Sequence, residues 1–399
     1  MKTFSLKRLC HALALPVVLL TFSANAELSF IFTNAAAQAM PRRDSIIFIQ
    51  VDGLGYGDLS CYGQTKFQTP NLDKLAGGGI RFTNYSIAEA ASPTHAALML
   101  GKNPAHVRQR ADVDIPLATN EVTVAQILKK AGYHTGLIGE WNLGDENSSG
   151  APWKKGFDEF AGYLGYGDSK HFYDDYIWRS DPDFSYDESY HDPINGHWRA
   201  WDKTKGPSIP GKETIYVNSR GKNQYIPDLF TKAALHFVRN NLPDPLNQYQ
   251  PFFLLLNYNI PNAKIQVPSD APFSEEGWPP AEKNRAALIL RIDGYIGQLR
   301  EQLDKVGMTN NVAVFFFSGS VPKKSAETDP NFFHSNISTN DFRTPMLICW
   351  PGGIPAGKIS GVKCSPEDFL PTAAEIARAH SPTNIDGASI IKSLSQNKE

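Results

Sequence analysis

The chain has 399 residues, of which 41% are hydrophobic and 20% charged, a composition ordinary for a globular protein. This length fits one large α/β domain or two smaller ones. The formal net charge is −2 and no basic run occurs, so the sequence gives no electrostatic reason to expect a nucleic-acid partner.

The N-terminus has the pattern of a secretory signal peptide. A basic segment at 2–8 precedes the apolar run 12–20, and Ala-Asn-Ala at 24–26 is a small-x-small cleavage signature. The apolar run is too short for a stable membrane span. The alternative to a signal peptide is a buried N-terminal helix. We therefore expect residues 1–26 to be removed and the mature protein to be secreted or periplasmic, without a membrane span. Residues 27–43 lack periodicity and are expected to form a lead-in.

Apolar runs alternate with helical patterns over residues 44–392, which we expect to form one domain followed by a tail at 393–399. Continuous apolar strands between helices predict an α/β fold with a large, mostly parallel, twisted sheet sandwiched by helices. Residues 145–225, rich in aromatic residues, Asp, Gly and Pro, predict long surface loops. In chain order the predicted elements are a strand at 45–51, a helix at 69–76, a helix after Pro93, a helix at 122–131, a strand at 134–138, a helix at 229–240, a strand at 252–258, a helix at 286–306, and strands at 312–317 and 346–350.

Sites in such sheets form in the loops beyond the carboxyl ends of the strands. The loops that meet this condition begin at Asp52, Gly139, Asn259 and Ser318. We therefore expect any functional site to combine residues from these loops.

Three cysteines remain after the signal peptide, namely Cys61, Cys349 and Cys364. A disulfide between Cys349 and Cys364 would be compatible with an oxidising compartment, but the sequence leaves this open. No CxxC spacing occurs, which argues against a structural zinc site.

A series of motifs resembles the type I sulfatase family, within the alkaline-phosphatase-like superfamily. The motifs follow one another over nearly the whole mature chain, and the resemblance implies the sulfatase fold. Family members usually continue into a small C-terminal subdomain, which we expect to be missing because few residues follow 386–390. The motifs are VDGLGYGDLSCYG at 51–63, TPNLDKLAGGGIRFTNYS at 69–86, SPTHAALMLGK at 92–102, LKKAGYHTGLIGEWNLG at 128–144, KGFDEF at 155–160, RIDGYIGQLREQLDKVGMTNNVAVFF at 291–316, FRTPMLICWPGGIP at 342–355, DFLPTAAEIA at 368–377 and DGASI at 386–390.

The resemblance implies a set of functional residues that this sequence has largely replaced. Family members use formylglycine, made from a cysteine or serine in a C/S-x-P-x-R motif. They also use calcium held by three Asp and one Asn, and Lys, His and Arg side chains that clamp the sulfate. The corresponding positions are Val51 and Asp52 for the paired aspartates, Ala91 for the motif cysteine, His95 for its arginine, Glu140 and Asn142 for a lysine and a histidine, Asn262 for a second histidine, Gly319 and Ser320 for the late Asp-Asn metal pair, and, in a loose alignment, His334 for a late lysine.

These replacements predict a catalytically inactive sulfatase homologue, a pseudo-sulfatase. Ala91 has no group to oxidise, and Asp52 is the one metal-ligand candidate kept. Glu140 would repel a sulfate, by roughly 4 kcal/mol for unit charges ~4 Å apart at an effective dielectric of ~20. We therefore expect none of these positions to be catalytic, and we expect no calcium or formylglycine cofactor. The expected partner is a sulfated glycan, a small sulfate ester or another glycan.

Other interpretations stay open. The chain could be an active sulfuric or phosphoric ester hydrolase with a site rebuilt from Asp52, His95 and His334, or a subunit that accompanies an active sulfatase. Ser92 or Thr94 could replace the nucleophile, although a hydroxyl at this turn more commonly caps the following helix. The aromatic residues of 157–201 could stack on sugar rings or pack over the edge of the sheet. Asp58 and Asp73 are expected to be structural.

Overall fold

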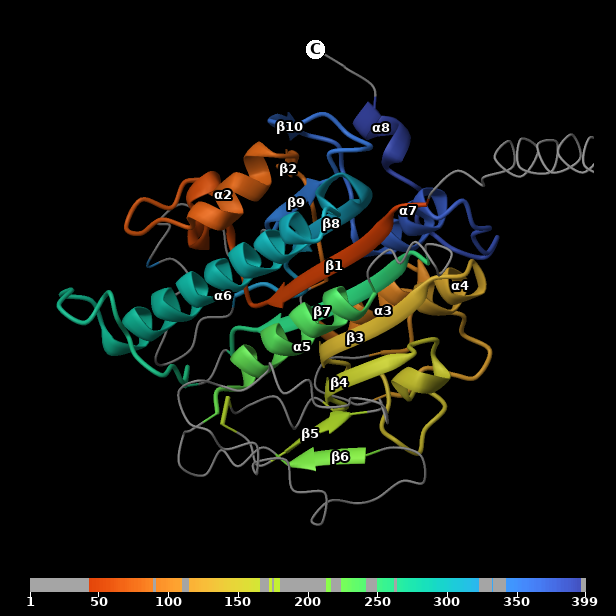
Figure 1. Cartoon of the computed structure of the whole chain (residues 1–399), viewed down its shortest axis with the longest axis horizontal. Coiled ribbons are helices and arrows are strands. Elements are labelled where there is room, and N and C mark those ends of the chain that lie inside the picture. Colours follow the sequence, from red (N-terminus) through yellow and green to blue (C-terminus); the bar gives the residue numbers. More distant parts are fainter. Residues whose placement is uncertain are drawn as a thin grey trace, which may run out of the picture. The chain divides into compact units, whose positions relative to one another are not determined.

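The computed structural model describes residues 43–88, 91–109, 115–165, 172–173, 176–179, 213–216, 224–241, 250–261, 264–322, 332 and 342–395. These residues form a ten-stranded sheet with the strand order β10-β2-β9-β8-β1-β7-β3-β4-β5-β6 (Figure 1). The strands are β1 Ser45–Asp52, β2 Ile80–Phe82, β3 His134–Glu140, β4 Glu159–Tyr163, β5 Tyr176–Arg179, β6 Glu213–Tyr216, β7 Phe252–Asn259, β8 Val312–Phe317, β9 Met346–Cys349 and β10 Lys358–Ser360. The helices are α2 Pro70–Gly77, α3 Ala91–Leu100, α4 Val124–Lys130, α5 Ile226–Asn240, α6 Pro280–Lys305, α7 Phe369–Ile376 and α8 Ile391–Ser395.

The central strands of the sheet are parallel neighbours. β1 pairs in parallel with β7 and β8, and β3 pairs in parallel with β7 and β4. Antiparallel pairs occur toward the two ends, between β8 and β9, β9 and β2, β4 and β5, and β5 and β6. The predicted α/β fold with a mostly parallel sheet is confirmed. Because parallel neighbours end at the same edge, the loops after β8, β1, β7 and β3 meet there.

Helices cover both faces of the sheet. α2, α5 and α6 pack on one face, to which β1 contributes Ile47 and Ile49. α3, α4 and α7 pack on the other face, to which β1 contributes Ile46 and Phe48. In Figure 1, α5 and α6 lie in front of the strands and α3 lies behind them. All four side chains are fully buried, and burial of each stabilises the fold by about 1.5–3 kcal/mol, which explains why β1 is apolar on both faces.

The start of α2 is stabilised by a carboxylate from α6. The residue before the helix, Thr69, makes no side-chain capping hydrogen bond. Instead, Asp293 accepts hydrogen bonds from the backbone N–H groups of Asn71 and Leu72, at 3.0 and 2.8 Å. The free N–H groups at a helix start favour a negative charge. This contact fastens α2 to α6.

Two sequence expectations are wrong in part. Residues 145–225, expected as loops, contribute β4, β5 and β6 to one end of the sheet. β5 and β6 are short antiparallel strands without the continuous apolar run that marks a buried strand. α3 begins at Ala91 rather than after Pro93, because a proline in the first turn of a helix gives up no helical hydrogen bond.

The described aromatic residues of the 157–201 region pack inside the protein. Phe157, Phe160, Tyr163, Phe172 and Trp178 are all buried within the two core clusters. These five side chains favour the packing interpretation over stacking on sugar rings. Tyr173 is half-buried, and the side chains of the remaining aromatic residues of that region are not among those that the structure describes.

Cys349 and Cys364 form no disulfide. The Cys349 thiol lies in the core cluster on the α6 face and donates to the Gly78 carbonyl at 3.3 Å. Cys364 lies in the cluster on the opposite face, with its sulfur 3.2 Å from that of Met346. Because the two side chains belong to opposite faces of the sheet, this structure excludes the bridge that the sequence left open.

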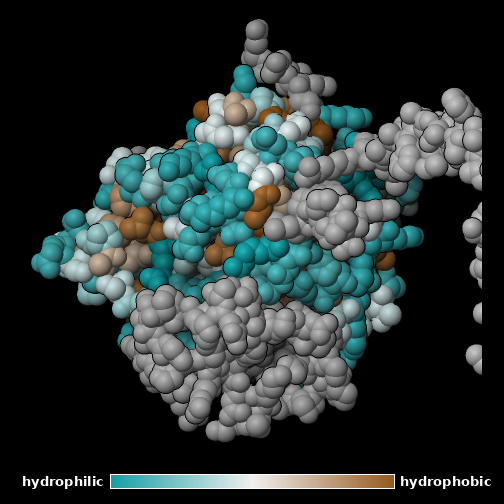
Figure 2. All heavy atoms as spheres, in the orientation of Figure 1, coloured by the Kyte–Doolittle hydropathy of each residue, from teal (hydrophilic) through white to brown (hydrophobic). Residues whose placement is uncertain are grey.

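The described surface is largely hydrophilic. Figure 2 shows a face on which hydrophilic residues predominate and apolar ones are scattered. Val122, Phe342 and Ile359 are the large apolar side chains that are exposed among the described residues. Scattered apolar residues of this kind are normal on soluble domains. No helix within the described ranges is both long and apolar enough to cross a lipid bilayer.

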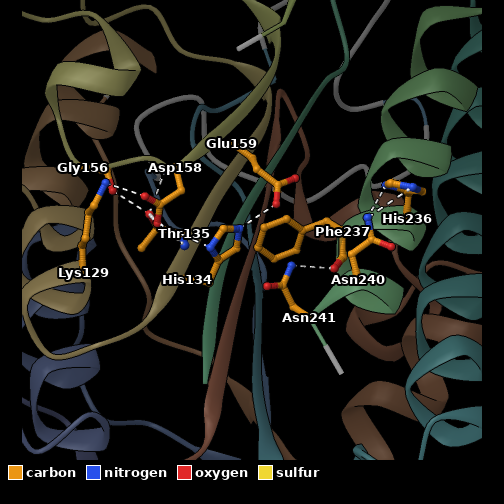
Figure 3. Close-up of polar contacts among 10 residues, drawn as sticks. All are labelled: Lys129, His134, Thr135, Gly156, Asp158, Glu159, His236, Phe237, Asn240 and Asn241. Atoms are coloured by element: carbon orange, nitrogen blue, oxygen red, sulfur yellow. Dashed lines mark hydrogen bonds and ion pairs between the residues drawn. The ribbon is translucent and has the colours of Figure 1, made fainter. Parts of the chain in front are cut away.

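A polar cluster lies where β3 begins, at the end of the strand opposite its carboxyl terminus (Figure 3). His134 Nε2 lies 2.6 Å from Glu159 Oε1 on β4, and the imidazole stacks on Phe237 of α5, with ring centroids 5.7 Å apart. Asp158, directly before β4, forms an ion pair with Lys129 of α4. The cluster therefore ties α4, β3, β4 and α5 together.

Glu159→Gln should destabilise the fold most at acidic pH. Burial disfavours the charged ring, but the hydrogen bond and charge of Glu159 and the charge of Asp158 outweigh it and raise the pKa of His134. A raised histidine pKa stabilises the fold fully below the unfolded pKa of about 6.5, and this stabilisation is lost as the pH rises through the folded pKa. In urea unfolding we expect a loss of about 0.5–1 kcal/mol near pH 5.5 and a smaller loss near pH 8.5. An equal loss at both pH values would contradict this assignment.

Candidate functional site

Polar side chains gather at the carboxyl edge of the central strands. Asp52 ends β1, Glu140 ends β3, Asn257 lies near the end of β7 and Ser318 follows β8. Each is at most 5% exposed. Burial of polar groups is costly unless they are hydrogen-bonded, so a cluster of them at this edge marks the candidate site.

Asp52 is hydrogen-bonded on both carboxylate oxygens. Gln50 Nε2 donates to Asp52 Oδ1 at 3.0 Å, and His95 Nε2 lies 3.0 Å from Asp52 Oδ2. Gln50 and Asp52 point to the same face because they are two positions apart on a strand. His95 reaches them from α3, which covers that face.

The charges around His95 favour its protonated ring. Burial opposes protonation, but the charge of Asp52, its hydrogen bond and the charge of Glu140 outweigh it, so the pKa of His95 is raised. The Trp141 backbone also favours the protonated ring, although no hydrogen bond of normal geometry reaches Nδ1. When its ring is protonated, His95 forms a buried ion pair with Asp52, and the two charges offset each other.

The segment after β3 carries an unusual backbone conformation. Asn142 has a φ of 58°, in the left-handed region that residues with side chains seldom adopt. Its Nδ2 donates to Glu140 Oε2 at 3.2 Å, and Asn257 Nδ2 donates to the Glu140 carbonyl at 2.6 Å. The Oδ1 atoms of Asn142 and Asn257 are buried and accept no hydrogen bond. Two acceptors without donors therefore lie beside Glu140.

The loop after β8 leaves no space for a side chain at position 319 beside Asp52. A Cβ at Gly319 would lie 2.2 Å from Asp52 Oδ1 and 2.1 Å from Gln50 Nε2. The Ser320 hydroxyl accepts a hydrogen bond from the Gly53 N–H at 2.8 Å. Among the described residues, no group of three or more His, Cys, Asp or Glu side chains could hold a metal ion. Calcium takes about 6–8 oxygen ligands, so the described residues do not fit the calcium site that the resemblance implies.

Val51, which the resemblance matches to a lost metal-binding aspartate, lies outside the site. As the strand neighbour of Asp52 it points to the opposite face, where it is fully buried in the cluster with α6. The residue on the other side of Asp52 is Gly53, where a Cβ would lie 2.5 Å from the Ile260 carbonyl oxygen. Neither chain neighbour of Asp52 can therefore place a second carboxylate beside it.

The position of the nucleophile carries only a methyl group. Ala91 is the first residue of α3. Ser92 and Thr94, considered as substitute nucleophiles, are buried in the first turns of that helix, at 3% and 0% exposure. Asn262 and His334, the remaining positions taken from the resemblance, lie outside the described residues.

Gln50, Asn257 and Ser318 contact the site but were not among the residues predicted for its chemistry. Gln50 and Asn257 interrupt the apolar strands IIFIQV and FLLLNY, and Ser318 directly follows a third apolar strand. A polar side chain is costly to bury without partners, so a polar interruption near the carboxyl end of a buried strand is itself a signal for a site.

Gly319→Ala should lower the free energy of unfolding by about 1–3 kcal/mol, because Gln50 or Asp52 has to move in a packed environment. Gln50→Ala removes the amide nearest to the new methyl group. The double variant should therefore lose less stability than the sum of the two single variants. Urea unfolding of the parent and the three variants measures this coupling, and strictly additive losses would show that Gln50 does not fill the space beside residue 319.

An arginine of α6 holds the loop that follows β1. Arg285 Nε and Nη2 donate to the Asp58 carboxylate at 3.1 and 2.6 Å, and Nη2 also donates to the Gly53 carbonyl at 2.8 Å. Asp58 accepts a further hydrogen bond from the Gly55 N–H at 2.7 Å. Both charged side chains are 5% exposed. Asp58 therefore has the structural role expected from the sequence.

Two curated relatives cover most of the chain. Human N-acetylgalactosamine-6-sulfatase is 27% identical over 396 residues, which cover 91% of this chain and 68% of the relative. Human arylsulfatase A is 28% identical over 376 residues, which cover 90% of this chain and 69% of the relative.

Solved structures share the fold. The crystal structure of Ps i-CgsB in complex with k-i-k-neocarrahexaose matches with a TM-score of 0.66 and 27% identity, covering 88% of this chain and 76% of that one. The structure of BT4656 in complex with its substrate D-glucosamine-2-N,6-O-disulfate matches with a TM-score of 0.62 and 20% identity, covering 89% and 81%. The sequence model of the Sulfatase family matches residues 44–379, which include the strands and helices that build the candidate site. The chain belongs to the sulfatase family.

Proposed function

We propose that this protein is an exported sulfatase homologue that binds glycans and does not hydrolyse sulfate esters. The observation that carries this proposal is the occupation of the metal position by the protein itself. Gln50 is hydrogen-bonded to one carboxylate oxygen of Asp52 and His95 to the other. Gln50 and Asp52 also fill the space that a side chain at position 319 would need.

The missing nucleophile supports the same conclusion. Hydrolysis by the family's route needs an oxidised side chain that attacks sulfur, and Ala91 offers only a methyl group. It also needs positive charge placed where negative charge develops on the sulfate. The described edge instead presents the carboxylates of Asp52 and Glu140, with His95 paired to the first of them.

A glycan is the ligand class that the comparisons favour. Relatives are named for an N-acetylgalactosamine sulfate, and two similar structures contain a neocarrahexaose and a glucosamine disulfate. The sheet edge where Asp52 and Glu140 lie is the place at which α/β folds bind ligands. The signal-peptide pattern at residues 1–26 would place this binding outside the cytoplasm.

An aryl sulfate assay tests the absence of hydrolysis. Purified protein supplied with calcium should release no product above a buffer blank, while human arylsulfatase A in the same assay serves as the positive control. Mass spectrometry of the peptide spanning residues 88–102 should show unmodified alanine at position 91. Turnover that is abolished by a chelator, or formylglycine in that peptide, would refute the proposal.

A rebuilt hydrolase is the second candidate function, and one observation favours it. The Asp52–His95 pair, with Nε2 and Oδ2 3.0 Å apart, resembles a general base oriented by a carboxylate. If this is its role, Asp52→Asn and His95→Gln should each abolish an activity found in a panel of sulfate and phosphate esters. A purified protein with no activity across that panel would exclude this candidate.

A further inference from the structure

The amide orientations of Asn142 and Asn257 are fixed by their neighbours. Each Nδ2 donates to an oxygen of Glu140, one to the side chain and one to the backbone carbonyl. Turning either amide by a half rotation would place its oxygen against that Glu140 oxygen, and two acceptors cannot bond each other. The two Oδ1 atoms are therefore held in place as acceptors.

Both of these acceptors are buried and lack a donor. Asn142 is 1% exposed and Asn257 is 3% exposed, and neither Oδ1 accepts a hydrogen bond. Folded proteins rarely leave buried polar atoms without partners. Because both amides are bonded to Glu140, the two oxygens belong to one neighbourhood. A donor from outside the chain would satisfy them, and water would serve in the free protein.

The backbone at Asn142 also points to ligand binding. Only Asn142 and Arg378 are non-glycine residues with positive φ among the described residues. Arg378 is exposed near the end of α7, whereas Asn142 is buried between Glu140 and the site edge. Strained conformations of buried residues persist where the surroundings enforce them, and they concentrate at ligand sites.

The chemistry of the two oxygens selects against a sulfate group. A sulfate ester presents oxygens that only accept hydrogen bonds, so it would leave both amide oxygens unsatisfied. A sugar hydroxyl carries one O–H and can donate to one of them, so two hydroxyls would satisfy both. Sites that hydrogen-bond a hydroxyl discriminate strongly against an analogue that lacks it.

Building on the glycan-binding function proposed above, we propose that Asn142 and Asn257 each recognise a free hydroxyl group of the glycan. At the positions that contact these two residues the glycan thus carries hydroxyl groups rather than sulfate, as in the product rather than the substrate of a sulfatase. In the free protein, water takes the place of these hydroxyls.

Calorimetric titration with matched sugars tests this assignment. The probes are N-acetylgalactosamine and its 6-sulfate, and glucosamine and its 2-N,6-O-disulfate. We expect one unsulfated sugar to bind about tenfold or more tightly than its sulfated partner, the effect of one unsatisfied buried acceptor. Equal or tighter binding of the sulfated sugars, or binding of none of the four, would overturn the proposal.

Two glycine substitutions separate recognition from backbone effects. Asn142→Gly removes the amide oxygen and also relieves the left-handed conformation, so the variant should fold with an undiminished melting temperature. Arg378→Gly, at the exposed residue with the same type of backbone conformation, is the matched control. Only Asn142→Gly should lose the preference for the unsulfated sugar. An unchanged preference in Asn142→Gly would remove Asn142 from the recognition site.

This outcome is distinguishable from a failure of the proposed function. If the sugars do not bind and the aryl sulfate assay shows no turnover, the hydroxyl assignment fails while the absence of hydrolysis stands. If turnover is found, the proposed function fails whatever the sugar preference.

Discussion

Arg285→Ala is expected to lower the free energy of unfolding by about 3–5 kcal/mol, because it leaves a charged carboxylate buried without its partner. Asp58 is 3% exposed and receives two hydrogen bonds from Arg285. The arginine also donates to the Gly53 carbonyl, so its removal frees the loop that directly follows Asp52. Urea unfolding monitored by far-UV circular dichroism measures the loss.

Two further variants make this prediction specific. Lys305→Ala breaks an exposed ion pair with Glu301 on the same helix and should change stability by less than about 0.5 kcal/mol. Asp58→Asn combined with Arg285→Met removes both charges and should cost less than Arg285→Ala alone. If Arg285→Ala is as mild as Lys305→Ala, the clamp on the loop after β1 has no energetic importance.

His95→Ala is expected to cost about 3 kcal/mol near pH 6, since among the described side chains it leaves the buried Asp52 carboxylate with Gln50 as its remaining hydrogen-bond donor. The pKa of His95 is raised, because the charge and hydrogen bond of Asp52 outweigh the opposing effect of burial. The stabilisation from this ring is fully present below the unfolded pKa of about 6.5 and is lost as the pH rises through the folded pKa. The cost of His95→Ala should therefore be smaller near pH 9 than near pH 6.

The control for this prediction removes the buried charge as well as the ring. Asp52→Asn combined with His95→Ala should recover part of the stability lost in His95→Ala at pH 6, and its stability relative to the parent gives the net contribution of the pair. Chemical unfolding at both pH values provides the measurement. A cost of His95→Ala that increases with pH would mean that the ring is neutral in the folded protein.

The central part of the fold follows from local patterns in the sequence. The strands around β1 are continuously apolar because both of their faces are covered by helices, so their positions were predicted within a few residues. The same rule misses β5 and β6, which are short, pair antiparallel at one end of the sheet and carry no such run. The start of α3 was misplaced because Pro93 looks like a boundary but fits the first helical turn.

The location of the site was predicted from the sequence, but the contacts among its side chains were not. The rule that sites lie beyond parallel strands brings together the loops after β1, β3, β7 and β8. Two features of the site depend on contacts between residues far apart in the chain. Gln50 fills the space beside Gly319, and Asn257 donates a hydrogen bond to Glu140. Local patterns carry no information about such contacts. Val51 was misplaced because the period of two along a strand sends it to the opposite face from Asp52.

Gln50 and His95 together explain how Asp52 can be buried at the edge of the sheet without the cation that the proposed function excludes. A lone buried carboxylate is unfavourable, but Asp52 receives an amide hydrogen bond on one oxygen and an imidazole on the other. Glycine at 319 provides the space for this arrangement, since any larger residue there would contact Gln50 and Asp52. In the proposed function, the three residues at 50, 95 and 319 together take the place of a metal site.

The calcium content of the purified protein is the most direct test of this account. After dialysis against calcium and removal of free ion, elemental analysis should find no stoichiometric divalent metal, and a chelator should leave the melting temperature unchanged. A bound calcium ion in each chain that is lost in Asp52→Ala would contradict the account.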